Sequence, residues 1–198
     1  MLQKSNKRNH AAVFRSATFC YKPRVLPALL NVFLAPSVWA DCNAHLPAST
    51  PDTQFSLDTP AAGAALVHDG KTGLTWMRCS LGQQWNATSN QCLNDPAQAW
   101  SFTWTQALAA AKSSRYAGLS DWRLPNKKEL ASIVDLRCWQ PAINPVVFPD
   151  SPMGKFWTAS PVTYSDQFYA WYVDFADGSY GNLGNDKLLW VRLVRDDS

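Results

Sequence analysis

Residues 118–130 read GLSDWRLPNKKEL and hold several local structure signals within a short span. A glycine turn and a tryptophan precede Pro125, which has no backbone N–H to donate to a regular element. Asn126 is placed as a helix N-cap, and Glu129, three residues later, completes a capping box. Apolar residues then follow at helical spacing: Leu130, Ile133 and Val134. The stretch therefore predicts a helix that begins at Asn126 and buries one face.

An earlier helix is predicted from a second capping box. Thr103 is its N-cap and Gln106 reaches back to it. One apolar stripe follows: Trp104, Ala107, Leu108 and Ala111. Gly118 is placed to end this helix, because glycine adopts the left-handed conformation common at helix ends.

Other segments predict strands. Residues 66–67 and 74–77 flank turn residues at 69–73, and residues 168–175 alternate so that one side carries Tyr169, Trp171, Val173 and Phe175. Asp177-Gly178 favours a hairpin turn. A glycine- and asparagine-rich segment, 180–185, then leads to a predicted closing strand, 188–194. Prolines at 141, 145, 149 and 152 predict a long loop without regular structure.

The first 40 residues differ from the rest in charge and hydropathy. They hold six basic and no acidic side chains, and an apolar run over 25–40 ends Val38-Trp39-Ala40. This order is typical of a secretory signal peptide, with cleavage predicted after Ala40. A membrane anchor is the alternative, although this run contains two prolines and a span needs about 20 apolar residues.

Cleavage would leave an arm over residues 41–60, rich in Pro, Thr, Ser and Ala, and a domain over residues 61–198. The remaining 12 basic and 15 acidic side chains give a net charge near −3. Nucleic-acid binding, which needs a basic field, is therefore not expected. No membrane span is expected after cleavage, and the predicted location is periplasmic, cell-surface or extracellular.

Four cysteines follow the leader: Cys42, Cys79, Cys92 and Cys138. An even number in an exported chain favours two disulfides over metal binding. Three pairings exist in principle. We predict Cys79–Cys92, which closes a short loop, and Cys42–Cys138, which ties the arm to the domain.

Six segments together resemble the Lcl C-terminal domain family, long described only as a domain of unknown function. They are residues 69–79, 118–125, 128–130, 156–160, 171–175 and 191–195, and the resemblance spans about residues 61–197. The Asp-Trp-Arg-Leu-Pro run at 121–125 and the closing Val-Arg-Leu-Val-Arg at 191–195 are its most specific parts.

The resemblance implies an α+β fold of the C-type-lectin-like kind, with two helices packed on a small, twisted antiparallel sheet with long loops. It also implies a bacterial cell-surface or envelope setting. The adhesin that gives the family its name binds sulphated polysaccharides and carries this domain on a collagen-like stalk. The present chain has no collagen-type repeat, so multivalent binding through such a stalk is not expected.

One candidate function for this fold is calcium-dependent sugar binding. The Glu-Pro-Asn, Gln-Pro-Asp and Trp-Asn-Asp strings of familiar lectins of this fold do not occur. Calcium takes six to eight oxygen ligands, and four carboxylates of the last third could converge to supply some: Asp166, Asp174, Asp177 and Asp186. We expect instead that Asp177 forms a turn and the others are solvated, so no metal and no cofactor is predicted.

The preferred ligand site is the segment from Tyr180 to Lys187, because a sugar needs a flat apolar plate, here the Tyr180 ring, beside polar groups. The polar groups are Asn182, Asn185, Asp186 and Lys187. A basic patch around the second helix, with two further basic residues late in the first, could hold sulphate groups or be ordinary surface charge. Its members are Arg123, Lys127, Lys128 and Arg137, together with Lys112 and Arg115. Four aromatic residues are predicted in loops and exposed: Trp85, Trp100, Trp139 and Tyr180.

No nucleophile–base or zinc motif is present, and His45 and His68 are the only histidines after the leader. Together with the resemblance, this predicts a non-catalytic recognition or adhesion domain that binds carbohydrate, a sulphated polysaccharide or another surface polymer. The alternative is a protein-binding accessory subunit of a pilus or secreted assembly.

Overall fold

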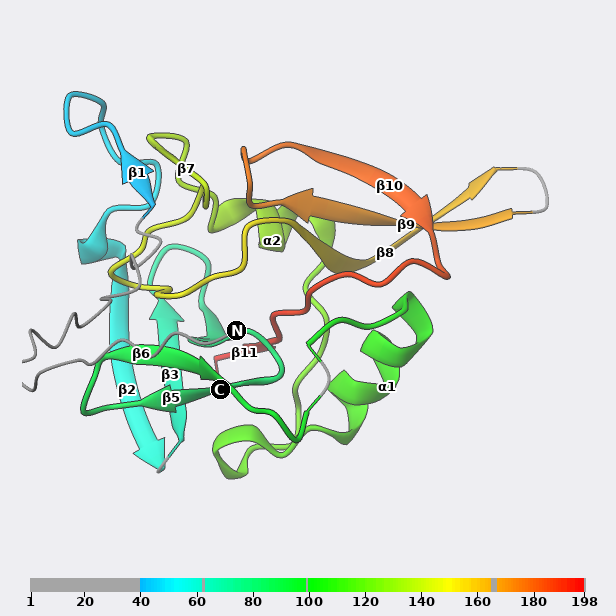
Figure 1. The fold of residues 1–198 in the computed structure, drawn as a ribbon, viewed down its shortest axis with the longest axis horizontal. Helices are drawn as coiled ribbons and strands as arrows, with labels where there is room; N and C mark the ends of the chain where they lie inside the picture. The colour runs from blue at the N-terminus through cyan, green and yellow to red at the C-terminus, as the bar shows by residue number, and fades with distance from the viewer. Residues whose placement is uncertain (1–39, 62, 99, 165–166, 198) are drawn as a thin grey trace, which may run out of the picture. The chain divides into compact units, whose positions relative to one another are not determined.

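The computed structural model describes residues 40–61, 63–98, 100–164 and 167–197, so the predicted signal peptide falls outside it except for Ala40. These ranges form two α-helices, α1 (Trp104–Ser113) and α2 (Lys127–Ser132), and short antiparallel sheets (Figure 1). Two 3-10 turns, η1 (Asp52–Gln54) and η2 (Tyr116–Gly118), complete the helical part. The predicted mixed α+β class is confirmed, while its lectin-like arrangement stays a prediction.

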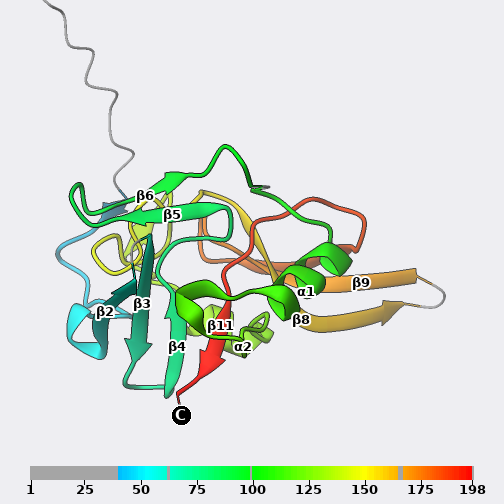
Figure 2. The ribbon, with the colours of Figure 1, turned by 90° about the horizontal axis from the view of Figure 1, so that it is seen from below.

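The largest sheet has the order β11-β4-β3-β2 (Figure 2). Its strands are β2 (Phe55–Ala61), β3 (Ala64–Asp69), β4 (Leu74–Met77) and β11 (Val194–Asp196). The turn between β3 and β4 is held by Asp69, whose carboxylate accepts hydrogen bonds from Lys71 N and Thr72 Oγ1. Because β2 pairs with β3, residues 55–60 of the predicted arm form a strand of this sheet.

A second sheet has the order β10-β9-β8. It consists of β8 (Lys155–Tyr164), β9 (Gln167–Asp174) and β10 (Tyr180–Gly184), and the β8–β9 hairpin extends past the end of β10 (Figure 1). The predicted alternation in β9 is confirmed, because Val173 joins one core cluster and Ala170 the other. The first cluster contains Leu130 of α2, whereas the second contains Ala107 and Ala111 of α1.

Four short strands form two further pairs. β1 (Asp41–Cys42) pairs with β7 (Cys138–Trp139), and β5 (Gln83–Asn86) pairs with β6 (Gln91–Asn94). Two expectations about aromatic residues change here. Trp85 and Trp139 lie in strands rather than loops, and Trp85 is buried, because it packs with Ala65 and the Cys79–Cys92 bridge. Trp100, Trp139 and Tyr180 are exposed as predicted.

Both capping boxes are present. Thr103 Oγ1 accepts from Gln106 N, and Asn126 Oδ1 accepts from Glu129 N at 3.0 Å. The predicted end of α1 at Gly118 is wrong, because α1 stops at Ser113 and Gly118 belongs to η2. No helix in the described ranges has the length and apolar character needed to cross a membrane.

The predicted closing strand over 188–194 is also wrong. β11 begins only at Val194, because the preceding residues cross between different partners. Leu189 pairs with Phe102, Trp190 lies beside Phe156, and Val194 pairs with Trp76 of β4. The segment therefore connects the two sheets rather than extending one.

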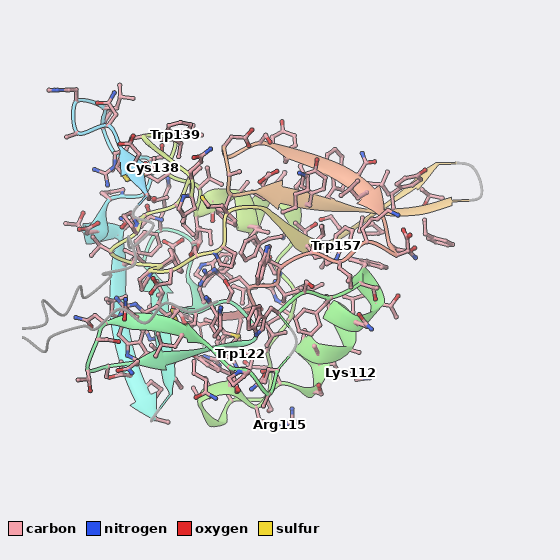
Figure 3. All side chains as sticks on the ribbon, in the orientation of Figure 1. Lys112, Arg115, Trp122, Cys138, Trp139 and Trp157 are labelled. Atoms are coloured by element: carbon pink, nitrogen blue, oxygen red, sulfur yellow. A yellow bond between two sulfur atoms is a disulfide. The ribbon has the colours of Figure 1, made fainter. Side chains whose placement is uncertain are left out.

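The stretch 118–130 links these layers. Trp122 is buried and donates from Nε1 to Tyr116 O at 3.0 Å. Arg123 exchanges backbone hydrogen bonds with Val194, and Pro125 O accepts from Ala159 N of β8 at 2.7 Å. Trp122 and Trp157 lie among the inner side chains (Figure 3). This most specific part of the sequence thus connects η2, α2 and both sheets.

Both predicted disulfides are confirmed. Cys79–Cys92 joins residues separated by 13 positions, and Cys42–Cys138 joins residues separated by 96. The second bridge holds β1 against β7, where Cys42 pairs with Cys138 in register. Two disulfides suggest an oxidising, exported location.

Candidate functional site

One face of the β9–β10 pair carries the exposed chemistry. In an antiparallel pair, directly opposite residues project to the same face. Tyr180 lies opposite Val173 and Asn182 lies opposite Trp171. Because Val173 packs in the same core as Leu130 of α2, Trp171, Tyr180 and Asn182 project on the α2 side.

The first residue of α2 completes this face. Lys127 Nζ lies 3.8 Å from the centroid of the Trp171 ring and 4.3 Å from that of Tyr180. The two ring centroids are 6.1 Å apart and the rings are tilted by 59°. A cation over an aromatic face is attracted by the ring quadrupole. We call Lys127, Trp171 and Tyr180 the Lys127 clamp.

The clamp is held by local structure. Lys127 N donates to Ser160 Oγ of β8 at 3.0 Å, directly after the Asn126 cap. Tyr180 is 60% exposed, whereas Trp171 and Lys127 are half-buried. Among the described residues no carboxylate lies within ion-pair distance of the Lys127 ammonium. The clamp therefore presents a positive charge beside an accessible ring.

The other predicted basic residues differ in kind. Arg123 binds Glu129 at 2.8 Å and Asp196 at 2.7 Å, and the hydrogen bond that it donates to Glu129 is the main cause that raises the pKa of its guanidinium. Arg123 thus fastens α2 to β11. Lys128 is exposed and follows Lys127 in α2. Lys112 and Arg115 lie on the α1 side, at the margin of the view (Figure 3).

The structure separates the two ends of the predicted sugar-binding segment, because residues 180–184 form strand β10 rather than a loop. At about 3.3 Å per residue, Tyr180 and Asn185 lie roughly 16 Å apart. Asn185 O accepts from Trp104 N at the start of α1, and Asp186 pairs with Lys187 at 2.8 Å. Tyr180 and Asn182 are therefore brought to the clamp, and residues 185–187 are not.

The family model for the Lcl C-terminal domain matches residues 65–195, about two thirds of the chain. The chain belongs to the Lcl C-terminal domain family. No curated protein matches it. The matched range contains the clamp and the β10-β9-β8 sheet. It also contains the four-stranded sheet apart from β2, Ala64 and Asp196, whereas Cys42 precedes it.

The described carboxylates considered for calcium in this Lcl C-terminal domain have separate partners. Asp174 pairs with Lys155 at 2.8 Å, Asp177 accepts from Ser179 N at 2.9 Å, and Asp166 lies outside the described residues. Hydrogen bonds from Ser179 are the main cause that lowers the pKa of Asp177. No group of three or more His, Cys, Asp or Glu side chains fit to hold a metal occurs in the described ranges.

Sequence reasoning placed Trp171 on a strand face but did not assign it to the site. The signal that could have assigned Trp171 to the site is the Asp177-Gly178 turn, because a hairpin at this turn places Asn182 opposite Trp171. The docking of α2 that brings Lys127 over the ring has no local signal. It depends on Leu130 packing against the core beneath Val173.

Proposed function

We propose that this Lcl C-terminal domain is an exported, non-catalytic recognition module of the bacterial cell envelope that binds carbohydrate or another surface polymer at the Lys127 clamp. The observation that carries the proposal is the accessible Tyr180 ring beside an ammonium group with no carboxylate partner among the described residues. A sugar ring would stack on Tyr180, and Asn182 would hydrogen-bond its hydroxyl groups. Lys127 and Lys128 would attract anionic substituents.

A glycan array with the oxidised protein, including sulphated and neutral polymers, tests this proposal. Tyr180→Ala and Lys127→Met should each weaken binding by about 1–2 kcal/mol, roughly tenfold, because each removes one of the three members of the clamp. Binding of sulphated polymers should also fall as salt is raised, since the exposed charge is screened. Binding should persist in chelator.

Two variants serve as matched controls. Trp139→Ala removes an aromatic side chain that is 54% exposed on β7, and Lys187→Met removes an exposed lysine at the other end of β10. Both should bind like the unaltered protein. Loss of binding in Lys187→Met but not in Lys127→Met would move the site to residues 185–187 and contradict the proposal.

A protein-binding accessory role is the second candidate, and one surface favours it. Leu46, Leu136 and Trp139 are 50%, 70% and 54% exposed around the Cys42–Cys138 bridge. Asn43 N donates to Arg137 O at 2.8 Å, so the segments that carry these side chains lie side by side. If no glycan binds and Trp139→Ala abolishes capture of an envelope protein, this role replaces the first.

A further inference from the structure

A hollow of about 680 Å³ lies between the second half of α1, η2 and strands β3 to β5. This volume is within the range of small-molecule sites. Its lining shares no residue with the Lys127 clamp. The apolar part includes Met77, Leu81 and Phe102, and the polar part includes Gln84, Gln98 and Arg115.

Two glutamines of the lining are oriented by one carboxylate. Asp95 Oδ2 accepts from Gln84 Nε2 at 2.7 Å and from Gln98 Nε2 at 3.1 Å. Asp95 belongs to the lining of the neighbouring hollow and not to that of this one. Because a carboxylate attracts the amide N–H groups and repels the amide oxygen, both Oε1 atoms are directed away from Asp95.

Asp95 is itself fixed. Its backbone N donates to Gly82 O at 2.9 Å, and its Oδ1 accepts from Ala97 N at 2.9 Å. The backbone hydrogen bond from Ala97 is the main cause that lowers the pKa of Asp95, so the carboxylate stays ionised at neutral pH. The two glutamine oxygens are therefore pre-positioned acceptors.

The apolar part is equally constrained. Phe102 exchanges backbone hydrogen bonds with Leu189 at 2.9 and 3.0 Å, and its carbonyl accepts from Trp157 Nε1 at 2.8 Å. The half-buried Phe102 ring thus has a fixed backbone beneath it. Arg115 is the one charged side chain in the described lining, and no carboxylate belongs to it. Arg115 Nη1 donates to Ser114 O at 2.7 Å, and the rest of the lining is uncharged, so the amide oxygens and apolar side chains suit a neutral ligand that is rich in hydrogen-bond donors.

We infer that this hollow is a second binding site, for a short neutral saccharide of one or two rings. Gln84 and Gln98 accept hydrogen bonds from its hydroxyl or acetamide N–H groups, while Phe102 and Leu81 contact its apolar face. Asp95 is a positioning residue that acts through the two amides. The site is independent of the clamp and of what the clamp binds.

Nuclear magnetic resonance of the ¹⁵N-labelled, oxidised protein tests the inference with N,N′-diacetylchitobiose and cellobiose. The two disaccharides share one linkage and differ in their acetamide groups, so the pair also reports which donor is preferred. Either sugar should produce saturable shifts of the Gln84 and Gln98 side-chain amides and of the Phe102 backbone amide. Asp95→Asn should weaken binding about tenfold, since both amides lose their fixed orientation.

Asp58→Asn is the matched control, because Asp58 is exposed on β2 and is not part of the lining. Gln98→Ala replaces Asp95→Asn if the latter does not fold, and should also weaken binding. The inference is wrong if neither sugar shifts the two glutamine amides at millimolar concentration, or if Asp95→Asn and Gln98→Ala both bind like the unaltered protein. Shifts confined to Trp171 and Tyr180 would overturn it and support the clamp instead.

Discussion

Arg192 is the residue whose environment differs most from the ordinary. Its guanidinium is fully buried, and it donates to Met77 O at 2.8 Å, to Arg78 O, to Ser80 Oγ at 3.3 Å and to Ser151 Oγ at 2.8 Å. Burial lowers the pKa of Arg192 to about 9, which still leaves it charged at neutral pH. Among the described residues no carboxylate pairs with it, so carbonyl and hydroxyl oxygens balance its charge together with the Phe148 ring, whose centroid lies 4.8 Å from the guanidinium carbon.

Arg192→Met should therefore lower the free energy of unfolding by about 3–5 kcal/mol, because several buried acceptors lose their donor. Denaturant unfolding at pH 7 measures this change. Lys187→Met, which breaks only a surface ion pair with Asp186, is the control and should change stability by about 1 kcal/mol or less. Similar losses for the two variants would show that the hydrogen bonds from Arg192 to its buried acceptors contribute little to stability.

The clamp shows what residue types alone could predict. Tyr180 and Lys127 were both expected at ligand sites, but in two separate patches, because nothing local indicates which lysine meets which ring. Their contact depends on the β9–β10 register and on the docking of α2. Arg123 was likewise expected at an anion site because it is basic. In the structure its guanidinium instead pairs with two carboxylates of the same chain, Glu129 and Asp196.

The β9–β10 turn offers a test of packing at the scale of one element. Gly178 has φ +82°, and a Cβ built there would lie 2.9 Å from Val134 Cγ1 and 3.3 Å from Leu136 Cδ2. Gly73, in the β3–β4 turn, has φ +67° but no atom within 4 Å of such a Cβ. The two glycines share a left-handed backbone and differ in their surroundings.

Gly73→Ala should cost about 1 kcal/mol, the penalty of the left-handed backbone alone. Gly178→Ala should cost about 2–4 kcal/mol, because overpacking adds to that penalty. Thermal or denaturant unfolding of the two variants measures the difference. Equal losses would mean that Val134 and Leu136 move aside without cost.

Helix starts were predictable because capping boxes are local: Thr103 with Gln106 and Asn126 with Glu129 both form as expected. The closing segment was not, because residues 188–193 have strand-like composition but find partners in different sheets. Their conformation is decided by tertiary contacts to Phe102 and Phe156, which no pattern within the segment encodes. The prediction of where α1 ends was wrong for the same reason, since η2 is fixed by the packing of Trp122 on Tyr116.

At the scale of the whole molecule, the two disulfides connect different regions. Cys79–Cys92 packs with Ala65 and Trp85, beside the strand that carries Gln84. Cys42–Cys138 instead holds β1, which precedes the range matched by the family model. Chain entropy assigns about 3 kcal/mol to a short closed loop and nearly 5 kcal/mol to one of about 100 residues. Both bridges therefore stabilise the fold, but they should protect different sites.

Replacing Cys42 and Cys138 by serine should lower global stability by about 4–5 kcal/mol, since this bridge closes the longer loop. Backbone hydrogen exchange should accelerate over residues 41–50, and disaccharide binding at the α1 hollow should not change. Replacing Cys79 and Cys92 should lower stability by about 3 kcal/mol plus the packing lost around Trp85. Exchange should then accelerate in β5 and β6, and disaccharide binding should weaken, because Gln84 loses its anchored strand. Unchanged exchange in β5 and β6 would mean that the packing of Trp85, rather than the covalent bridge, positions this side of the hollow.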